Sequence, residues 1–373
     1  MAAAESVAPS RSEGAELESK LAVIRELLAA HRLSAARLRR HDWFAWATCG
    51  ASNAVITTTQ EGVAELFVTA DEACVLTDTV EEARLRHEEL PDGLDVAAFG
   101  WGRPQDRERY VRAHAHGDGI ASDSPLGGER PLPDQLGTAR QRLYPEELER
   151  YRRLGHETAQ AVTEALAAAT PEATERDLAG WGAAALYRRG IHPALILVGG
   201  ARRLRLYRHP TPTDERLGER AMLVVCGRRH GLYANLTRFV SFREPTAEER
   251  QLAQVVAAVE AAAWDESVPG RTLGQVYEAI VASYARLGYP GAERQHHQGG
   301  LTGYLSREAL AVRDSPVRIA PWAALAWNPS LPGAKIEDTV VASGFGLEVL
   351  TRDPAWPTLI VQGRARPDLL VVD

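Results

Sequence analysis

Three short stretches of the sequence combine chemically active side chains with glycine or proline. One places the adjacent imidazoles of His296 and His297 before a pair of glycines, and the others span residues 226–238 and 327–339. Each has the pattern of a short apolar strand that Gly or Pro interrupts and that ends in polar side chains. Strands of this kind deliver side chains into clefts. We therefore predict that the three stretches meet at one site.

Composition narrows the class of protein and of partner. The chain has 373 residues, 45% of them hydrophobic and 25% charged, which is typical of a globular protein large enough for two domains. Its longest aliphatic runs, such as residues 195–198, are far shorter than the roughly 20 residues of a membrane span. A net charge of -7 argues against a broad nucleic-acid surface. We expect a small-molecule substrate and neither a nucleic-acid nor a membrane partner.

The cysteines and the N-terminus indicate a compartment. Cys49, Cys74 and Cys226 show no CxxC spacing and are too few for a disulfide framework, which favours the reducing cytoplasm. The first residues lack the basic start and the continuous apolar core of a signal peptide. We predict a disordered tail over residues 1–15.

The region up to residue 140 has the pattern of a small α/β domain, which we place at residues 16–140. Helices and strands alternate along it, as is typical of that fold class. A stretch rich in Pro and Gly, residues 122–133, indicates that the domain ends near residue 140. The predicted elements are a helix over residues 16–32, a hairpin of the runs 63–69 and 73–77, and helices near 81–90 and 105–114 on either side of an extended segment at 95–99.

The remainder, residues 141–373, contains an internal repeat. Thr174 and Thr272 lie 98 positions apart, and each stands where the N-cap of a helix is expected. Both helices end near a glycine, and each follows a long Ala-rich helix, at about 146–168 and 246–265. Chance similarity of helix ends is the alternative. The shared order, spacing and caps favour a duplicated α+β unit with a cleft between its halves.

The order of the motifs resembles the creatinase/aminopeptidase P/methionine aminopeptidase family. The resemblance covers about residues 140–360 and implies the pseudo-two-fold "pita-bread" fold, preceded by the α/β N-terminal domain of the creatinase branch. It also implies a homodimer, for which the apolar stretch 43–46 offers a surface. The motifs that carry it are His209-Pro210, Cys226-Gly227, Asn235 to Arg238, His297 to Gly300, Asn328-Pro329 and Lys335 to Thr339.

The resemblance is weakest at the positions that would hold two metal ions. Those positions correspond to Cys226, Asn235, His297, Asn328 and Glu337. Two Asn side chains replace carboxylates, which removes charge that a pair of divalent ions requires. We therefore expect no metal cofactor. The alternative is one divalent ion, for example zinc on the thiolate, the imidazole and the remaining carboxylate.

Acid–base groups remain at some of these positions and at one other family position. The resemblance implies catalytic roles for His209, His297 and Glu337, with Tyr304 in place of the family's second cleft histidine. An imidazole with a pKa near ~6.5 that a carboxylate orients is a competent general base. Creatinase uses this fold without metal, with histidine and glutamates acting on a small guanidino acid.

Several further side chains are candidates for binding a carboxylate-bearing substrate, because arginine suits bidentate carboxylate recognition. Some of these side chains, and Cys226, have a simpler alternative: His296 as a structural neighbour, Cys226 as a buried inert thiol, Arg228 and Arg229 as solvated turn residues, and the tryptophan as core. The binding candidates are His296, Asn235, Asn328, Arg228, Arg229, Arg238, Arg307 and Trp327.

Three functions are compatible with these residues. The first is a metal-independent, creatinase-like hydrolase that acts on a C–N bond of a small amino-acid-like molecule. The second is a metal-dependent Xaa-Pro-type aminopeptidase with unusual ligands. The third is a catalytically inactive pita-bread protein that serves as a binding or scaffold module. Metal analysis of the purified protein would separate the second hypothesis from the other two.

Overall fold

The structure is a computed structural model that describes residues 11–117 and 119–372. The chain forms two compact units, residues 1–140 with 144–147, and residues 141–143 with 148–373. Among the described residues, none of the helices has both the length and the apolar character that a membrane span needs.

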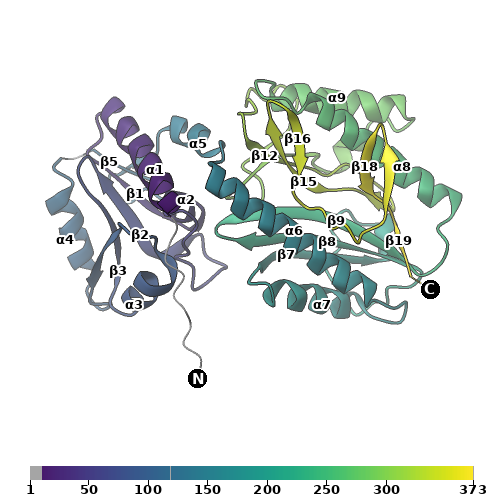
Figure 1. The fold of residues 1–373 in the computed structure, drawn as a ribbon, viewed down its shortest axis with the longest axis horizontal. Helices are drawn as coiled ribbons and strands as arrows, with labels where there is room; N and C mark the ends of the chain where they lie inside the picture. The colour runs from purple at the N-terminus through teal and green to yellow at the C-terminus, as the bar shows by residue number, and fades with distance from the viewer. Residues whose placement is uncertain (1–10, 118, 373) are drawn as a thin grey trace. The chain divides into compact units, whose positions relative to one another are not determined.

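The first unit is built on one six-stranded sheet with the order β4-β3-β2-β1-β5-β6 (Figure 1). The β2–β3 hairpin is antiparallel, as predicted, and β4 pairs with β3 in parallel. The strands are β1 (Ala35–Arg40), β2 (Glu61–Thr69), β3 (Ala73–Asp78), β4 (Asp95–Phe99), β5 (Ile120–Ser122) and β6 (Arg130–Pro131). The helices are α1 (Arg11–Ala30), α2 (His41–Ala47), α3 (Glu82–Arg84), the π-helical turn η1 (Leu85–Glu89), α4 (Pro104–His114) and α5 (Asp134–Arg140).

Two expectations for this unit need correction. Helix α1 begins at Arg11 rather than at residue 16, so residues 11–15 are helical, and the rest of the predicted tail lies outside the described residues. The apolar stretch 43–46 belongs to α2, and Phe44 and Trp46 are both 0% exposed. These rings pack inside the unit, so they offer no surface for a partner chain.

The second unit contains two larger sheets, with the orders β19-β9-β8-β7 and β11-β10-β12-β15-β16, and two two-stranded sheets, β13-β14 and β17-β18. Figure 1 shows α7 on one side of the first sheet and α8 and α9 beside the second. The helices are α6 (Pro145–Ala167), α7 (Glu175–Tyr187), α8 (Ala247–Glu266), α9 (Leu273–Arg286) and the 3-10 turns η2 (Arg203–Arg205) and η3 (Ala292–Gln295). The strands are β7 (His192–Gly200), β8 (Arg220–Arg229), β9 (Leu232–Ser241), β10 (Gly299–Thr302), β11 (Ala309–Leu310), β12 (Ala323–Trp327), β13 (Ser330–Leu331), β14 (Ala334–Lys335), β15 (Asp338–Ser343), β16 (Gly346–Val349), β17 (Thr358–Val361), β18 (Arg364–Pro367) and β19 (Leu370–Val371).

The two halves of this unit repeat one plan. Thr174 and Thr272 are the N-caps of α7 and α9, and both form a capping box with the residue three positions later. Each threonine also forms an isolated bridge to a later segment, at Arg216 and at Arg318. A further bridge, Thr237 to Glu337, joins the two sheets. The helix caps that the repeat predicts are therefore present at equivalent places in both halves.

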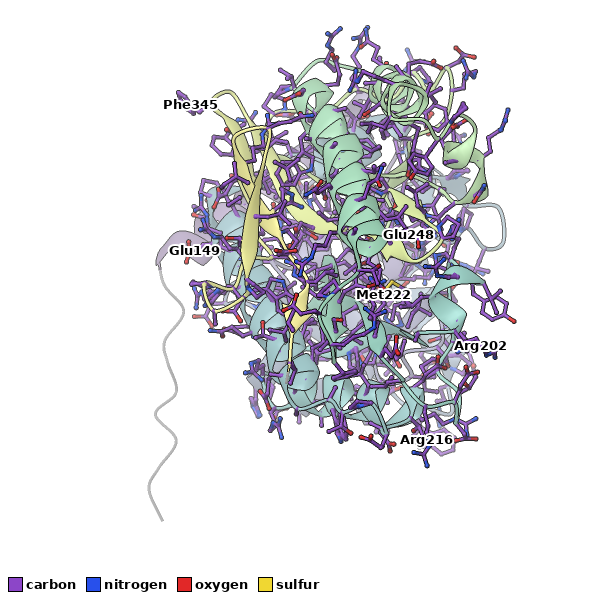
Figure 2. The ribbon with its side chains drawn as sticks, turned by 90° about the vertical axis from the view of Figure 1, so that its right-hand side faces the viewer. Glu149, Arg202, Arg216, Met222, Glu248 and Phe345 are labelled. Carbon is purple, nitrogen blue, oxygen red and sulfur yellow. The ribbon has the colours of Figure 1, made fainter. Side chains whose placement is uncertain are left out.

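The core of the second half fixes the strands that lead to the motif residues. Trp327 is 0% exposed, and its indole N–H donates a hydrogen bond to Ser267 Oγ at 2.9 Å. It packs with Trp264, Leu325 and Tyr284 between α8, α9 and the sheet. At the opposite extreme, Phe345 is 98% exposed at the turn between β15 and β16 (Figure 2). Trp327 is thus a core residue, and the expectation that it lines a substrate pocket is wrong.

Candidate active site

Three histidines from two distant parts of the chain meet in the second unit. Ring nitrogens of His209, His296 and His297 lie within 4.8 Å of one another. The Nε2 atoms of His209 and His296 are 2.8 Å apart, and the rings of His296 and His297 stack with centroids 4.3 Å apart. His209 is exposed, whereas His296 and His297 are partly buried. We call these residues the histidine cluster.

Polar contacts hold the two segments together. Arg208 donates a hydrogen bond to Gln295 Oε1 at 2.6 Å, which ties the residue before His209 to the residue before His296. Gln298 is buried, and its Nε2 donates to the carbonyl of His296 at 2.6 Å. Side chains adjacent to the histidines in sequence, Arg208, Gln295 and Gln298, therefore fix the backbone that carries the cluster.

The glycine pair of the motif is required by close backbone packing. Gly299 has a φ of 102°, and a Cβ there would lie 2.1 Å from the carbonyl oxygen of Ala326. Gly300 has a φ of 151°, and a Cβ there would lie 2.1 Å from the carbonyl oxygen of Ala309. Only glycine lets β10 fit between β11 and β12 at this point. That fit places His297 two residues before the start of β10.

Glu337 is a buried carboxylate held between two cations. Its Oε1 accepts a hydrogen bond from Arg307 at 2.6 Å, and its Oε2 lies 3.4 Å from the ammonium of Lys335 and accepts from Thr237 Oγ1 at 3.1 Å. Burial opposes ionisation, but Lys335 and Arg307 outweigh it and lower the pKa of Glu337 to about 2. The hydrogen bonds described for this carboxylate go to these partners, so it does not orient an imidazole as expected.

The histidines are uncharged at neutral pH. Burial, followed by the charge of Lys335, lowers the pKa of His296 to about 2. Burial and Arg307 lower the pKa of His297 to about 4, and burial and Lys335 also lower the pKa of His209. In the close Nε2 pair, one neutral ring must donate an N–H and the other must accept it. The cluster therefore offers both an N–H donor and unprotonated ring nitrogens, and with pKa values below 6.5 these nitrogens are weaker bases than the sequence argument expected.

Lys335 is the functional residue that the sequence argument missed. It is 8% exposed and lies two positions before Glu337. Residues two apart in extended backbone point to the same side, so this spacing could have identified it. Arg307 was expected to bind substrate, and in the structure it contacts the protein's own carboxylate, Glu337.

The residues that the resemblance places at the family's metal positions do not suit a dinuclear centre. Asn235 and Asn328 are buried, and among the described residues their Oδ1 atoms have no hydrogen-bond partner. The remaining carboxylate, Glu337, already faces two cations. Two divalent ions would add positive charge to a site whose side chains already carry a net positive charge, without carboxylates to offset it.

Cys226 lies opposite Asn235 in the β8–β9 register and is buried. Burial, with a smaller effect of Glu337, raises the pKa of the Cys226 thiol to about 12. A thiol with such a pKa is protonated and weakly nucleophilic at neutral pH. The geometry therefore supports the simpler alternative, a buried inert thiol.

Three of the proposed substrate-binding arginines have other partners. Near the end of the β8–β9 hairpin, Arg229 donates hydrogen bonds to Glu157 and to the carbonyl of Arg189. Arg228 lies over the ring of Tyr233, and its guanidinium carbon is 5.8 Å from the ring centroid. Arg238 donates to Asp338 at 2.7 Å. Tyr304 is 1% exposed, and its backbone N–H donates to Glu308. The structure joins none of the three arginines to the histidine cluster.

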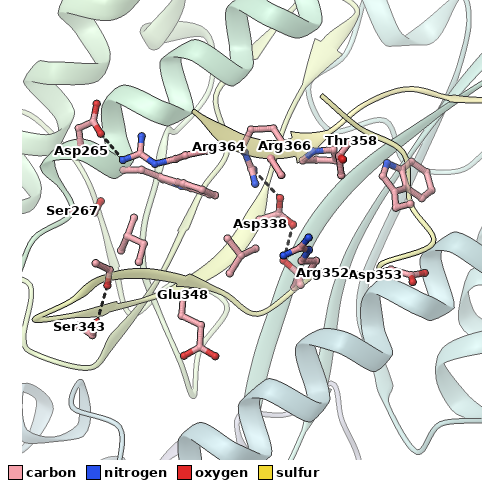
Figure 3. A pocket seen from close by; sticks show the side chains of 18 of the residues that line it. Asp265, Ser267, Asp338, Ser343, Glu348, Arg352, Asp353, Thr358, Arg364 and Arg366 are labelled. Carbon is pink, nitrogen blue, oxygen red and sulfur yellow. Dashed lines mark hydrogen bonds and ion pairs between the residues drawn. The ribbon is translucent and has the colours of Figure 1, made fainter. Parts of the chain in front are cut away.

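A cavity of about 910 Å³ opens in the same unit (Figure 3). Arg238, Asp338 and Arg366 line it, and Asp338 accepts hydrogen bonds from both arginines. Neighbouring residues in a strand alternate in direction, so Asp338 and Glu337 point to opposite sides. The histidines do not line this cavity.

Comparison with solved structures shows the fold. The prolidase from Pyrococcus horikoshii is 17% identical, with a TM-score of 0.76 over 90% of this chain and 98% of that chain. The dipeptidase PepE from Mycobacterium ulcerans is 19% identical, with a TM-score of 0.76 over 97% and 100%. The N-terminal domain of the FACT complex subunit SPT16 from Cicer arietinum is 11% identical, with a TM-score of 0.69 over 91% and 96%.

These likenesses confirm the predicted fold class, an α/β domain followed by a pita-bread domain. None of the curated proteins compared with the chain matches it. The family model described as metallopeptidase family M24 matches residues 149–343, more than half of the chain. The protein thus belongs to metallopeptidase family M24, and that membership places it among hydrolases.

Proposed function

We propose that this protein is a metal-independent hydrolase that cleaves a C–N bond in a small, carboxylate-bearing molecule. One observation carries the proposal: the buried Glu337 is neutralised by Arg307 and Lys335 beside a cluster of uncharged histidines. At this position two side chains supply positive charge, although only half of the charge that two divalent ions would bring. The acid–base groups remain accessible, because His209 is exposed.

The histidine cluster supplies both proton transfers that hydrolysis needs. One neutral imidazole accepts a proton from water as the water oxygen bonds to the reacting carbon. The proton then passes to the leaving nitrogen as the C–N bond breaks, so that the cluster returns to its starting state. The 2.8 Å contact between the Nε2 atoms of His209 and His296 provides a path for that proton.

The two cations favour an anionic substrate. Arg307, Lys335 and Glu337 together carry one net positive charge. Within the described structure, Nε of Arg307 makes no hydrogen bond, so the guanidinium retains a donor. A carboxylate of the substrate, or the negative charge that develops on a carbonyl oxygen, would interact favourably with this charge.

Similar proteins support this substrate class. The structures named above include a prolidase and a dipeptidase. A dipeptide contains both an amide C–N bond and a terminal carboxylate. We therefore place dipeptides, N-acyl amino acids and guanidino acids in the candidate substrate set.

The test is an activity screen on protein stripped of metal by a chelator and checked by elemental analysis. We expect turnover of at least one of these compounds without added metal. His209→Ala and His297→Ala should each lose about 10² to 10⁴ in kcat, the usual contribution of general acid–base catalysis. His192→Ala, which removes a histidine outside the cluster, is the matched control and should keep full activity.

Two outcomes would replace the proposal. Activity that appears only after stoichiometric metal is restored would favour the metal-dependent Xaa-Pro-type aminopeptidase. Inactivity with and without metal would favour the binding or scaffold protein, and the likeness to a domain of a FACT complex subunit gives that alternative a structural precedent.

A further inference from the structure

We propose that His209, His296 and His297 form a binding site for a single transition-metal ion, of which Zn²⁺ is the model, apart from the position of the family's dinuclear centre. The site goes beyond the proposed function and does not depend on it. Only His297 belongs to both sets of positions. The resemblance gives His209 and His296 no role as metal ligands.

Geometry is the first support. The three ring nitrogens already lie within 4.8 Å of one another, with the closest pair at 2.8 Å. Zinc binds imidazole nitrogen at about 2.0–2.1 Å, which sets nitrogens of a tetrahedral site about 3.3 Å apart. The closest pair, His209 and His296, must move apart by about half an ångström, whereas a pair at the 4.8 Å limit must close by about 1.5 Å. Rotation of the exposed His209 side chain adjusts its own distances, and the stacked rings of His296 and His297 must tilt toward a common point.

The chemistry of the ligands is the second support. Imidazole nitrogen is a preferred ligand of zinc, copper and nickel. The Nδ1 atoms of His296 and His297 are buried and have no hydrogen-bond partner among the described residues. The unpaired Nδ1 of His297 is available as a ligand, whereas His296 faces His209 through Nε2, so its own Nδ1 calls for a separate partner such as a water molecule. Three imidazoles also leave a fourth position on the exposed side, as in open zinc sites.

The surrounding charge sets the character of the site. Lys335 acts electrostatically on all three histidines, and Glu337 opposes it. With Arg307 included, the neighbours carry one net positive charge, which weakens the binding of a dication. An anionic fourth ligand would relieve this repulsion. We therefore expect zinc to bind more tightly in the presence of a small carboxylate such as acetate.

Metal binding and acid–base catalysis exclude each other at these residues. A ring nitrogen whose lone pair is bound to a metal ion cannot accept a proton. If the proposed function is correct, zinc inhibits the enzyme. Binding itself can be measured without any substrate, so failure of the site and failure of the proposed function remain distinguishable.

The experiment measures Zn²⁺ binding to metal-stripped full-length protein by competition with a chromophoric chelator. Co²⁺ absorption serves as a second probe of coordination geometry. We expect one ion per chain and absorption bands of a four-coordinate site. His296→Ala should lose at least about 100-fold in affinity, because it removes a direct ligand. His209→Gln tests the same point at an exposed position that tolerates substitution without loss of folding.

Matched variants separate this site from the dinuclear position. Asn235→Ala with Asn328→Ala removes side chains at that position and should leave Zn²⁺ affinity unchanged. Arg307→Gln removes a nearby cation and should tighten Zn²⁺ binding several-fold. Two ions per chain, loss of binding in the double Asn variant, or wild-type affinity in both histidine variants would each overturn the proposal.

Discussion

The ion group around Glu337 should make a large and pH-dependent contribution to stability, which Glu337→Gln would remove. The side chain of Glu337 is 3% exposed, and those of Arg307 and Lys335 are 16% and 5% exposed. Neutralising the carboxylate leaves both cations buried without a charged partner. Breaking a buried pair in this way costs about 3–5 kcal/mol.

The pKa shift gives an independent magnitude. The pKa of Glu337 falls from 4.5 to about 2 in the folded chain. That depression corresponds to about 3 kcal/mol of stabilisation at neutral pH. Because the folded pKa lies below the unfolded pKa, the stabilisation is present above pH 4.5 and is lost as the pH falls from 4.5 toward 2. The stability difference between wild type and Glu337→Gln should therefore be about 2 kcal/mol smaller at pH 3 than at pH 7.

The assay is urea unfolding followed by tryptophan fluorescence, since Trp264 and Trp327 lie in the same unit as Glu337. Glu348→Gln is the matched control, because the Arg152–Glu348 pair has exposures of 43% and 39%. An exposed pair contributes about 0–1 kcal/mol. A difference below about 1 kcal/mol at pH 7 for Glu337→Gln, or one that does not change with pH, would refute the electrostatic account.

Three further predictions address the site and the assembly. The pKa of His297 is lowered to about 4, so this histidine stays neutral when the pH falls below 6.5. If the reaction requires neutral His297, the rate should stay constant through pH 6.5 and decline only near pH 4, and a decline centred at pH 6.5 would contradict this. The double variant Asn235→Asp with Asn328→Glu adds two carboxylates, so calorimetry should detect Mn²⁺ binding that the wild type lacks at the same concentration. Equal Mn²⁺ binding by both proteins would contradict the argument that the missing carboxylate charge prevents a dinuclear centre. The family resemblance predicts a homodimer in light scattering at micromolar concentration, which a monomeric mass would disprove.

Local signals made much of the fold predictable. The threonine caps of α7 and α9 and the hairpin of β2 and β3 depend on residues only a few positions apart. The phase of a strand is harder to assign from one sequence. Arg238 and Trp327 stand beside motif residues, yet alternation in the strand directs both to the opposite side, Arg238 to an ion pair and Trp327 to the core.

The histidine cluster required the tertiary structure. His209 and His296 are 87 positions apart, and their contact depends on the bond between Arg208 and Gln295. No local pattern contains that information. The resemblance implied catalytic roles for His209 and His297 and left His296 as a binding candidate or a structural neighbour, whereas the structure gives His296 the shortest contact in the cluster.

The partners of Glu337 explain how a buried carboxylate persists where other carboxylates are absent. An ionised carboxyl group in a nearly water-free site must be offset by positive charge or become protonated. Arg307 and Lys335 provide that charge from fixed side chains, which cannot be removed by dilution or by a chelator. A site organised in this way keeps its electrostatic field in metal-free protein. The charges next to the uncharged histidines therefore do not depend on a bound metal ion. The pKa values of these histidines are determined by burial and by residues of the protein such as Lys335.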